Sequence, residues 1–115
     1  MALLSAAVHL DQRMAPVDID EGSEQALALA TREAFTNIIR HAGAARVELE
    51  LGAAGGGARL VIADDGRGGV EAHGNGLQGM RERLQAIGGR LEVDSPAGGG
   101  TRLVMWVPAK PAVAP

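Results

Sequence analysis

Residues 60–80 read LVIADDGRGGVEAHGNGLQGM, and this stretch decides the fold. Its first part completes an apolar run over residues 59–63, which predicts a strand buried on both faces. A loop with five glycines follows from Asp64 to Gly76. The chain then enters a helical pattern over residues 77–87, in which apolar residues recur on one side. The stretch therefore predicts a strand, a glycine-rich loop and a helix in direct succession.

The flanking segments predict one long helix and four further strands. A helical pattern covers residues 24–42, with Ser23 as a candidate N-cap and Gly43 suited to the C-terminus. The strands are predicted over residues 6–10, 46–51, 91–93 and 101–107, the last two joined as a hairpin. This order predicts an α/β two-layer sandwich, a mixed β-sheet with helices on one face. The domain would span residues 1–108, and residues 109–115 would be a disordered tail.

Composition limits the class of protein. A chain of 115 residues is one small domain. Its net charge of -3, without a basic tract, argues against a nucleic-acid surface, and the absence of cysteine excludes disulfides and thiolate metal sites. No apolar run is long enough to cross a bilayer. We therefore expect a cytoplasmic domain without direct membrane contact, although a longer parent protein could be anchored in a membrane.

The long helix carries a polar stripe. Glu33, Asn37 and His41 are spaced four residues apart, so they line up over two helical turns. Small residues lie between them and would leave room for a ligand (Ala26, Ala30 and Ala34). Two other faces are predicted, one towards the sheet (Leu27, Phe35, Ile38 and Ile39) and one towards solvent (Arg32, Thr36 and Arg40). A stripe that is merely solvated is the alternative.

The glycine loop offers two candidate binding elements. Asp64 ends a buried strand, where a carboxylate needs a hydrogen-bond donor such as the amino group of a heterocycle. Glycines at the start of the second helix would expose backbone N–H groups to an anion such as a polyphosphate. The spacing matches neither a Rossmann fingerprint nor a Walker loop. Taken singly, each element could equally be a solvated turn or a lid without a ligand.

Together these features resemble the motifs of the GHKL ATPases, the family of histidine kinases, DNA gyrase, Hsp90 and MutL. Residues 32–42 resemble its N box, residues 64–68 its G1 box, residues 74–80 its G2 box, and residues 98–101 its closing Gly-x-Gly-Thr motif. Order and spacing match from about Ser23 to Pro108. The resemblance implies the Bergerat ATP-binding fold, with ATP and Mg²⁺ as ligands.

The resemblance also implies roles for single residues. Asn37 would hold Mg²⁺, with Glu33 as a second candidate ligand. Glu33 would act as general base or polarising carboxylate, and His41 could reach a phosphate. Asp64 would accept from the adenine amino group, and Thr101 would contact adenine through water beside it. The remaining ATP contacts would come from the glycine loops and the second helix: Gly66, Gly68, Gly74, Gly76, Leu77, Gly79 and Met80. Asp65 and Arg67 are expected to face solvent.

Finer details are similar to the NarL/DesK-type sensor histidine kinases, notably the sequence GMRERL at residues 79–84 and the short lid between Gly68 and Gly74. The implied reaction transfers the γ-phosphoryl group of ATP to a histidine on a dimerisation domain of the parent kinase, with a response regulator downstream. His9 is the only histidine before the N box, and we predict it to be a strand residue. The isolated chain is then expected to be monomeric and not to autophosphorylate.

Three alternatives remain open at this stage. An anti-sigma-factor-type serine kinase shares the motifs and is often a small chain of its own. A non-catalytic module could bind nucleotide, or nothing, and serve as a docking surface. A clamp of the MutL or gyrase kind would need a long lid and a second domain.

Overall fold

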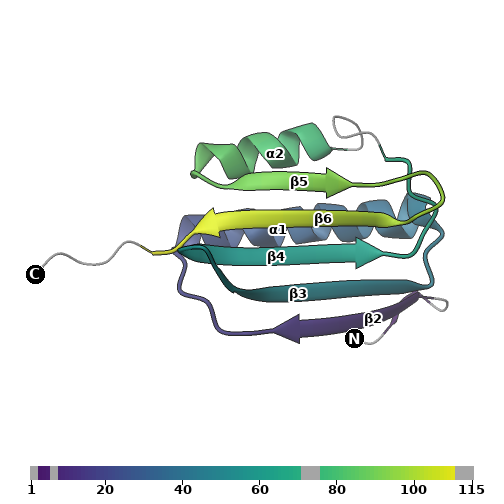
Figure 1. The fold of residues 1–115 in the computed structure, drawn as a ribbon, viewed down its shortest axis with the longest axis horizontal. Coiled ribbons are helices and arrows are strands. Elements are labelled where there is room, and N and C mark those ends of the chain that lie inside the picture. The colour runs from purple at the N-terminus through teal and green to yellow at the C-terminus, as the bar shows by residue number, and fades with distance from the viewer. Residues whose placement is uncertain (1–2, 6–7, 71–75, 111–115) are drawn as a thin grey trace, which may run out of the picture.

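The computed structural model describes residues 3–5, 8–70 and 76–110; the side chains of residues 3–5, 8, 41 and 42 are not described. The described residues form a six-stranded sheet in the order β1-β2-β3-β4-β6-β5. Its strands are β1 (Leu3–Ser5), β2 (Val8–Met14), β3 (Arg46–Ala54), β4 (Gly57–Asp64), β5 (Arg90–Asp94) and β6 (Thr101–Pro108). Only the β2–β3 pair is parallel among the described strands, and the other pairs are antiparallel. The mixed sheet and its two helices confirm the predicted fold class (Figure 1).

Helix α1 (Glu21–Asn37) begins three residues before the predicted start. Its N-cap is Asp20, whose side chain accepts a hydrogen bond from the Ser23 backbone N–H, so the predicted cap at Ser23 is wrong. An acidic residue at this position both satisfies a free N–H and matches the helix dipole. The helix continues as a π-helical turn, η1 (Ile38–Ala42), and ends at Gly43 with φ 62°, as predicted.

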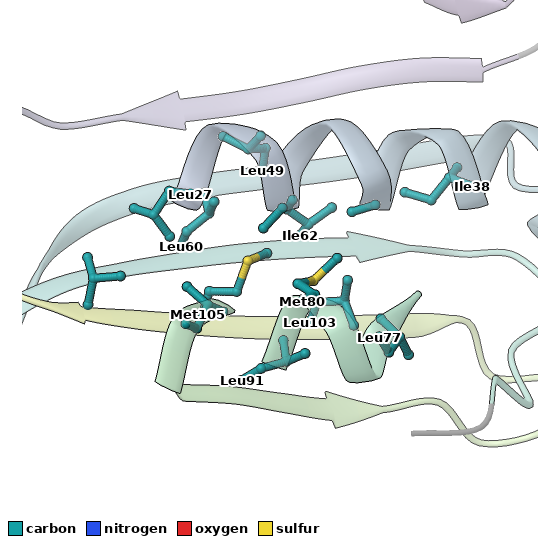
Figure 2. Close-up of a cluster of buried hydrophobic side chains, with 14 of the residues drawn as sticks. Leu27, Ile38, Leu49, Leu60, Ile62, Leu77, Met80, Leu91, Leu103 and Met105 are labelled. Carbon is teal, nitrogen blue, oxygen red and sulfur yellow. The ribbon is translucent and has the colours of Figure 1, made fainter. Parts of the chain in front are cut away.

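One core lies between the two helices and the sheet (Figure 2). It is built from Leu and Ile side chains with two methionines, including Leu27, Ile38, Leu60, Ile62, Leu77, Met80, Leu84, Leu103 and Met105. Ala30 and Ala34 are also buried in this core, which corrects their predicted place beside a ligand. Small residues here let the helix approach the sheet closely. Ile39 was predicted to face the sheet but is 54% exposed, because the wider π turn rotates it away from the core.

Burial in β4 alternates instead of covering both faces. Ala58, Leu60 and Ile62 are buried, whereas Arg59, Val61 and Ala63 between them are only half-buried. The prediction of a strand buried on both faces is therefore wrong. The physical reason is that both helices lie on one face, as in antiparallel sheets that leave their second face to solvent. Strand β3 alternates as predicted, with Val47 and Leu49 pointing into the core.

The far end of the sheet holds the only tryptophan of the chain. Trp106 of β6 pairs in register with Arg59 of β4, and its Nε1–H donates to the Ala54 carbonyl oxygen at 2.8 Å. The Arg90 guanidinium lies 4.6 Å from the centre of the ring, a cation–π contact. Gly57 allows this packing, since a Cβ there would lie 2.7 Å from ring atoms of Trp106.

Several other elements are longer than predicted. Strand β2 runs on to Met14, and β3 and β4 extend beyond the predicted strands to a tight turn at Gly55 and Gly56. Ala109 and Lys110, predicted to begin a tail, donate backbone hydrogen bonds to Gly56 and Asp18, and residues 111–115 lie outside the described part. None of the helices described has the length and apolar character needed to span a membrane.

Candidate functional site

Four chain segments end at the same side of the molecule. Figure 1 shows the end of β4, the start of β6, the C-terminal end of α1 and the start of α2 (Leu77–Ala86) gathered on the right of the view. The described residues of the four motifs lie on these segments or in the loops next to them. The fold therefore brings together motifs that are far apart in the sequence.

Asp64 ends β4 and pairs in register with Thr101, the first residue of β6. Its Oδ1 accepts a hydrogen bond from the Gly66 backbone N–H at 2.8 Å. Burial raises the pKa of Asp64, the charge of Asp65 adds to this, and hydrogen bonds from the Gly66 and Thr101 backbones oppose it. A half-buried carboxylate of this kind is stabilised by a further donor, such as the amino group of a bound heterocycle.

Glycines let the loops beside Asp64 pack against each other. A Cβ at Gly100 would overlap the Asp64 carbonyl oxygen, and one at Gly68 would overlap the Pro96 carbonyl oxygen. Both glycines have positive φ, 77° and 64°, which other residues rarely adopt. The loops that carry Gly68, Pro96 and Gly100 are therefore in close contact beside Asp64.

Ser95 connects the same loops, and sequence reasoning missed it. Its Oγ lies 2.7 Å from Thr101 Oγ1 and accepts from the Val70 backbone N–H at 3.0 Å. The Gly69 N–H donates to the Ser95 carbonyl oxygen at 2.9 Å. Ser95 therefore fixes both the Thr101 hydroxyl and the loop that follows Asp64. The only sequence feature that could have pointed to Ser95 was its position before a proline in the predicted hairpin turn.

Asp65 is exposed, as predicted, but it has a structural partner. Its Oδ1 accepts from the backbone N–H groups of Ala45 and Arg46 at 2.8 and 2.9 Å. The hydrogen bond from the Arg46 backbone is the main cause that lowers the pKa of Asp65. Desolvation opposes it, and the hydrogen bond from Ala45 adds to the lowering. Asp65 thus attaches the end of β4 to the start of β3.

A second part of the site is an open cleft of about 420 Å³ between α1 and α2. It is lined by Leu29, Arg32, Glu33, Thr36, Asn37, Gly76, Gly79 and Arg83. Glu33 and Asn37 of the polar stripe therefore share this cleft with Gly76 and Gly79 of the second motif. Arg32 and Thr36, assigned to the solvent face, also line this cleft. Arg83 was not predicted, and its Nη2 lies 2.7 Å from Glu33 Oε1.

Helix α2 presents its N-terminus beside this cleft. Gly76 is the N-cap residue, with φ 81°, and has no side chain with which to cap the helix. The first N–H groups of a helix and its dipole favour an anion. A phosphate chain would meet both this helix start and the cleft.

The other predicted residues are placed differently or not described. Leu77 and Met80 are 1% and 0% exposed and belong to the core, so any contribution to ligand binding is through the position of α2. Gly74 and Asn75 lie outside the described residues, as does the side chain of His41. His9 is an exposed residue of β2, as predicted for a strand residue. The described residues contain no group of three or more His, Cys, Asp or Glu that could hold a metal ion.

Comparison with known proteins identifies the family. Residues 22–111 match the family model of the histidine kinase-, DNA gyrase B- and HSP90-like ATPases. The chain belongs to this family. The resemblance of its motifs to the GHKL ATPases is thereby confirmed.

The curated relatives are sensor histidine kinases. The chain is 38% identical to the sensor histidine kinase LiaS of Bacillus subtilis over 81% of its own length and 27% of that protein. It is 32% identical to the sensor histidine kinase DesK of the same organism, over 81% of the chain and 26% of DesK. The chain thus spans about a quarter of the length of these relatives, and it corresponds to a DesK-type ATPase domain.

Solved structures agree with this assignment. The blue-light activated histidine kinase of Erythrobacter litoralis EL346 superposes with a TM-score of 0.78 at 25% identity, over 91% of this chain and 36% of that one. The ATP binding domain of PrrB from Mycobacterium tuberculosis gives a TM-score of 0.69 at 28% identity, over 89% of this chain and 82% of that one. The chain therefore has the fold of histidine kinase ATP-binding domains.

Proposed function

We propose that this chain binds ATP as the catalytic domain of a NarL/DesK-type sensor histidine kinase and transfers the γ-phosphoryl group to a histidine on a dimerisation domain. The observation that carries the proposal is the placement of Asp64 and of the Glu33–Asn37 cleft at one end of the sheet. Membership in the ATPase family and the similarity to sensor histidine kinases such as LiaS support it.

Adenine would bind at Asp64. The carboxylate would accept from the exocyclic amino group, and the Thr101 hydroxyl, held by Ser95, would contact the ring through water. Gly66 and Gly68 would let the backbone approach the flat ring. The phosphates would extend towards the start of α2, where Gly76 and Gly79 would leave the backbone accessible.

Mg²⁺ would be held mainly by the phosphates and water. The cleft offers one amide oxygen from Asn37 and one carboxylate from Glu33, which are hard oxygen donors suited to this ion. Two protein ligands agree with a cation that keeps several waters, and when bound it would neutralise charge on the phosphate oxygens. A cation that enters with the nucleotide fits this donor set.

Glu33 would act on the incoming nucleophile. Its carboxylate lies on the wall of the cleft, where it can orient an acceptor imidazole or take its proton. His41 follows Asn37 by four residues in the sequence, and we propose that it contacts a phosphate. Most of the acceleration in phosphoryl transfer comes from such positioning and charge neutralisation.

The proposed partners follow from this reaction. The acceptor histidine would lie on a dimerisation domain outside these 115 residues, and a response regulator would receive the phosphoryl group. We propose a cytoplasmic location, no direct contact with the membrane or with nucleic acid, and a monomeric state for the chain alone. Gel filtration showing a stable dimer would contradict the last of these.

The decisive test is a calorimetric titration with ATP, with and without Mg²⁺, for the wild type and the Asp64→Asn variant. We expect saturable binding by the wild type and a loss of about tenfold or more in the variant, because the carboxylate acceptor is weakened. Failure of the folded wild type to bind ATP would overturn the proposal. If ATP binds, a second experiment adds the helix-pair domain of a histidine kinase and tests whether the transferred phosphate is lost in acid. Phosphohistidine is labile in acid, whereas the phosphoserine that an anti-sigma-type kinase would form is stable.

A further inference from the structure

Arg83 of α2 and Glu33 of α1 face each other across the cleft. Arg83 Nη2 lies 2.7 Å from Glu33 Oε1, and both side chains are about one-third exposed, 38% and 33%. As whole side chains the two are partly exposed, but Arg83 Nε and Nη2 are themselves buried, so the pair is partly desolvated. The pair lies on the wall of the cleft that Asn37 and the α2 glycines share.

The first turn of α2 packs directly against this pair. A Cβ at Gly76 would lie 3.8 Å from Glu33 Oε2, and one at Gly79 would lie 3.4 Å from Arg83 Nη1. A Cβ at either position would therefore make ordinary van der Waals contact with the carboxylate or the guanidinium. The pair occupies the space between the two helices at the point where α2 begins.

A phosphate chain in this cleft would lie beside the carboxylate of Glu33. Like charges in a partly desolvated site repel each other strongly enough to reduce affinity. Arg83 supplies a positive charge at contact distance from that carboxylate. Arg32 is on the same wall but is exposed, so its charge is better screened by water.

We propose that Arg83 is a positioning residue that neutralises and orients Glu33, so that an ionised Glu33 and a polyphosphate can occupy the same cleft. The inference rests on the proposed function, because it assumes that the phosphates of a nucleotide bind here. Arg83 acts through Glu33 rather than as the main phosphate ligand. Its removal should therefore weaken nucleotide binding only while residue 33 carries a charge.

A double-mutant cycle tests this coupling. The affinity for a non-hydrolysable ATP analogue at fixed Mg²⁺ is measured for the wild type, Arg83→Gln, Glu33→Gln and the double variant. We expect Arg83→Gln to weaken binding about tenfold when Glu33 is present and less than about twofold in the Glu33→Gln background. Arg83→Lys, which keeps the charge, should stay within about threefold of the wild type.

Two outcomes would overturn the inference. An equal loss in both backgrounds would show that Arg83 binds the phosphates directly or acts only on the fold, and no loss in either would show that it is not needed. Thermal unfolding of each variant controls for folding, and Arg83→Met gives the same comparison if Arg83→Gln does not fold, because it keeps the apolar stem. Failure of the wild type itself to bind would instead refute the proposed function.

Discussion

The carboxylates of Asp64 and Asp65, adjacent in the chain, have pKa values shifted in opposite directions. Burial raises the pKa of Asp64, and hydrogen bonds from the Arg46 and Ala45 backbones lower that of Asp65. The first carboxylate faces the candidate adenine site, and the second attaches β4 to β3. The end of β4 thus carries a candidate binding carboxylate and a structural carboxylate side by side.

Nucleotide affinity should fall as the pH is lowered through the raised pKa of Asp64. Only the ionised carboxylate accepts freely from the adenine amino group, and its protonation begins at a higher pH than for an ordinary aspartate. Titration with adenosine, which carries no phosphate, isolates this effect. Asp64→Asn should give weaker binding that is flat over the same pH range, and a flat profile for the wild type would contradict the assignment.

Lowering the pH should weaken nucleotide binding, but through the same raised pKa of Asp64 it should increase the stability of the ligand-free protein. Since the folded protein binds the Asp64 proton more tightly than the unfolded chain, this residue contributes increasing stability as the pH falls through its folded pKa. Asp64→Asn should therefore stabilise the ligand-free protein at neutral pH while weakening adenosine binding. Urea unfolding with and without adenosine measures both effects in one experiment.

Replacing Asp65 with alanine should destabilise the fold. The change removes two backbone hydrogen bonds to an ionised acceptor, and because that carboxylate is exposed we expect a loss of about 1 kcal/mol. The lowered pKa means that the loss is present above the pKa of the unfolded chain and disappears as the pH falls through the folded pKa. Urea unfolding at neutral and acid pH measures it. Asp11→Ala, at another exposed aspartate, is the control and should change stability by less than about 0.5 kcal/mol.

Gly100→Ala and Gly98→Ala form a matched pair. Both residues have positive φ, 77° and 76°, but a Cβ at Gly100 would overlap the Asp64 carbonyl oxygen, whereas one at Gly98 would meet nothing within 4 Å. We expect Gly98→Ala to cost about 1 kcal/mol from backbone strain alone and Gly100→Ala about 3 kcal/mol or more. Denaturant unfolding compares the two, and similar losses would refute the close packing of these loops.

Asp20→Ala should cost about 1 kcal/mol, because it removes the acceptor that caps α1. Ser23→Ala should have a much smaller effect, since Ser23 contributes its backbone N–H to this cap. Thermal unfolding of both variants distinguishes the two candidate caps. A larger loss for Ser23→Ala would restore the assignment made from sequence.

Sequence alone predicted the order of elements from β2 onwards because the signals were local, whereas the short strand β1 (Leu3–Ser5) was not predicted. Each of these signals depends only on neighbouring residues. Examples are the alternation of Val47 and Leu49, the glycines around the second helix and the helix end at Gly43. The cap was missed because Asp20 and Ser23 are both good capping residues, and the choice between them depends on where the helix begins. Burial of β4 was overestimated because an apolar run does not reveal whether one or two faces are covered.

Sequence motifs offered some residues of the candidate site but none of the contacts between them. Glu33, Asn37 and Asp64 belong to motifs and could be found one by one. Ser95 and Arg83 act across the fold, on Thr101 and Glu33, and no local pattern indicates such pairs. The π turn after Asn37 also escaped prediction, because a helical wheel assumes a constant period.

Trp106 can serve as an intrinsic fluorescent probe of unfolding. The chain has no tyrosine, so its near-ultraviolet fluorescence comes from this indole. Trp106 pairs with Arg59, five residues along β4 from Asp64, which corresponds to about 17 Å of strand. Its emission should therefore follow the unfolding of the sheet while remaining nearly insensitive to an occupied nucleotide site. Unfolding can then be followed on an unlabelled sample, with and without nucleotide, without a direct contribution of the ligand site to the emission.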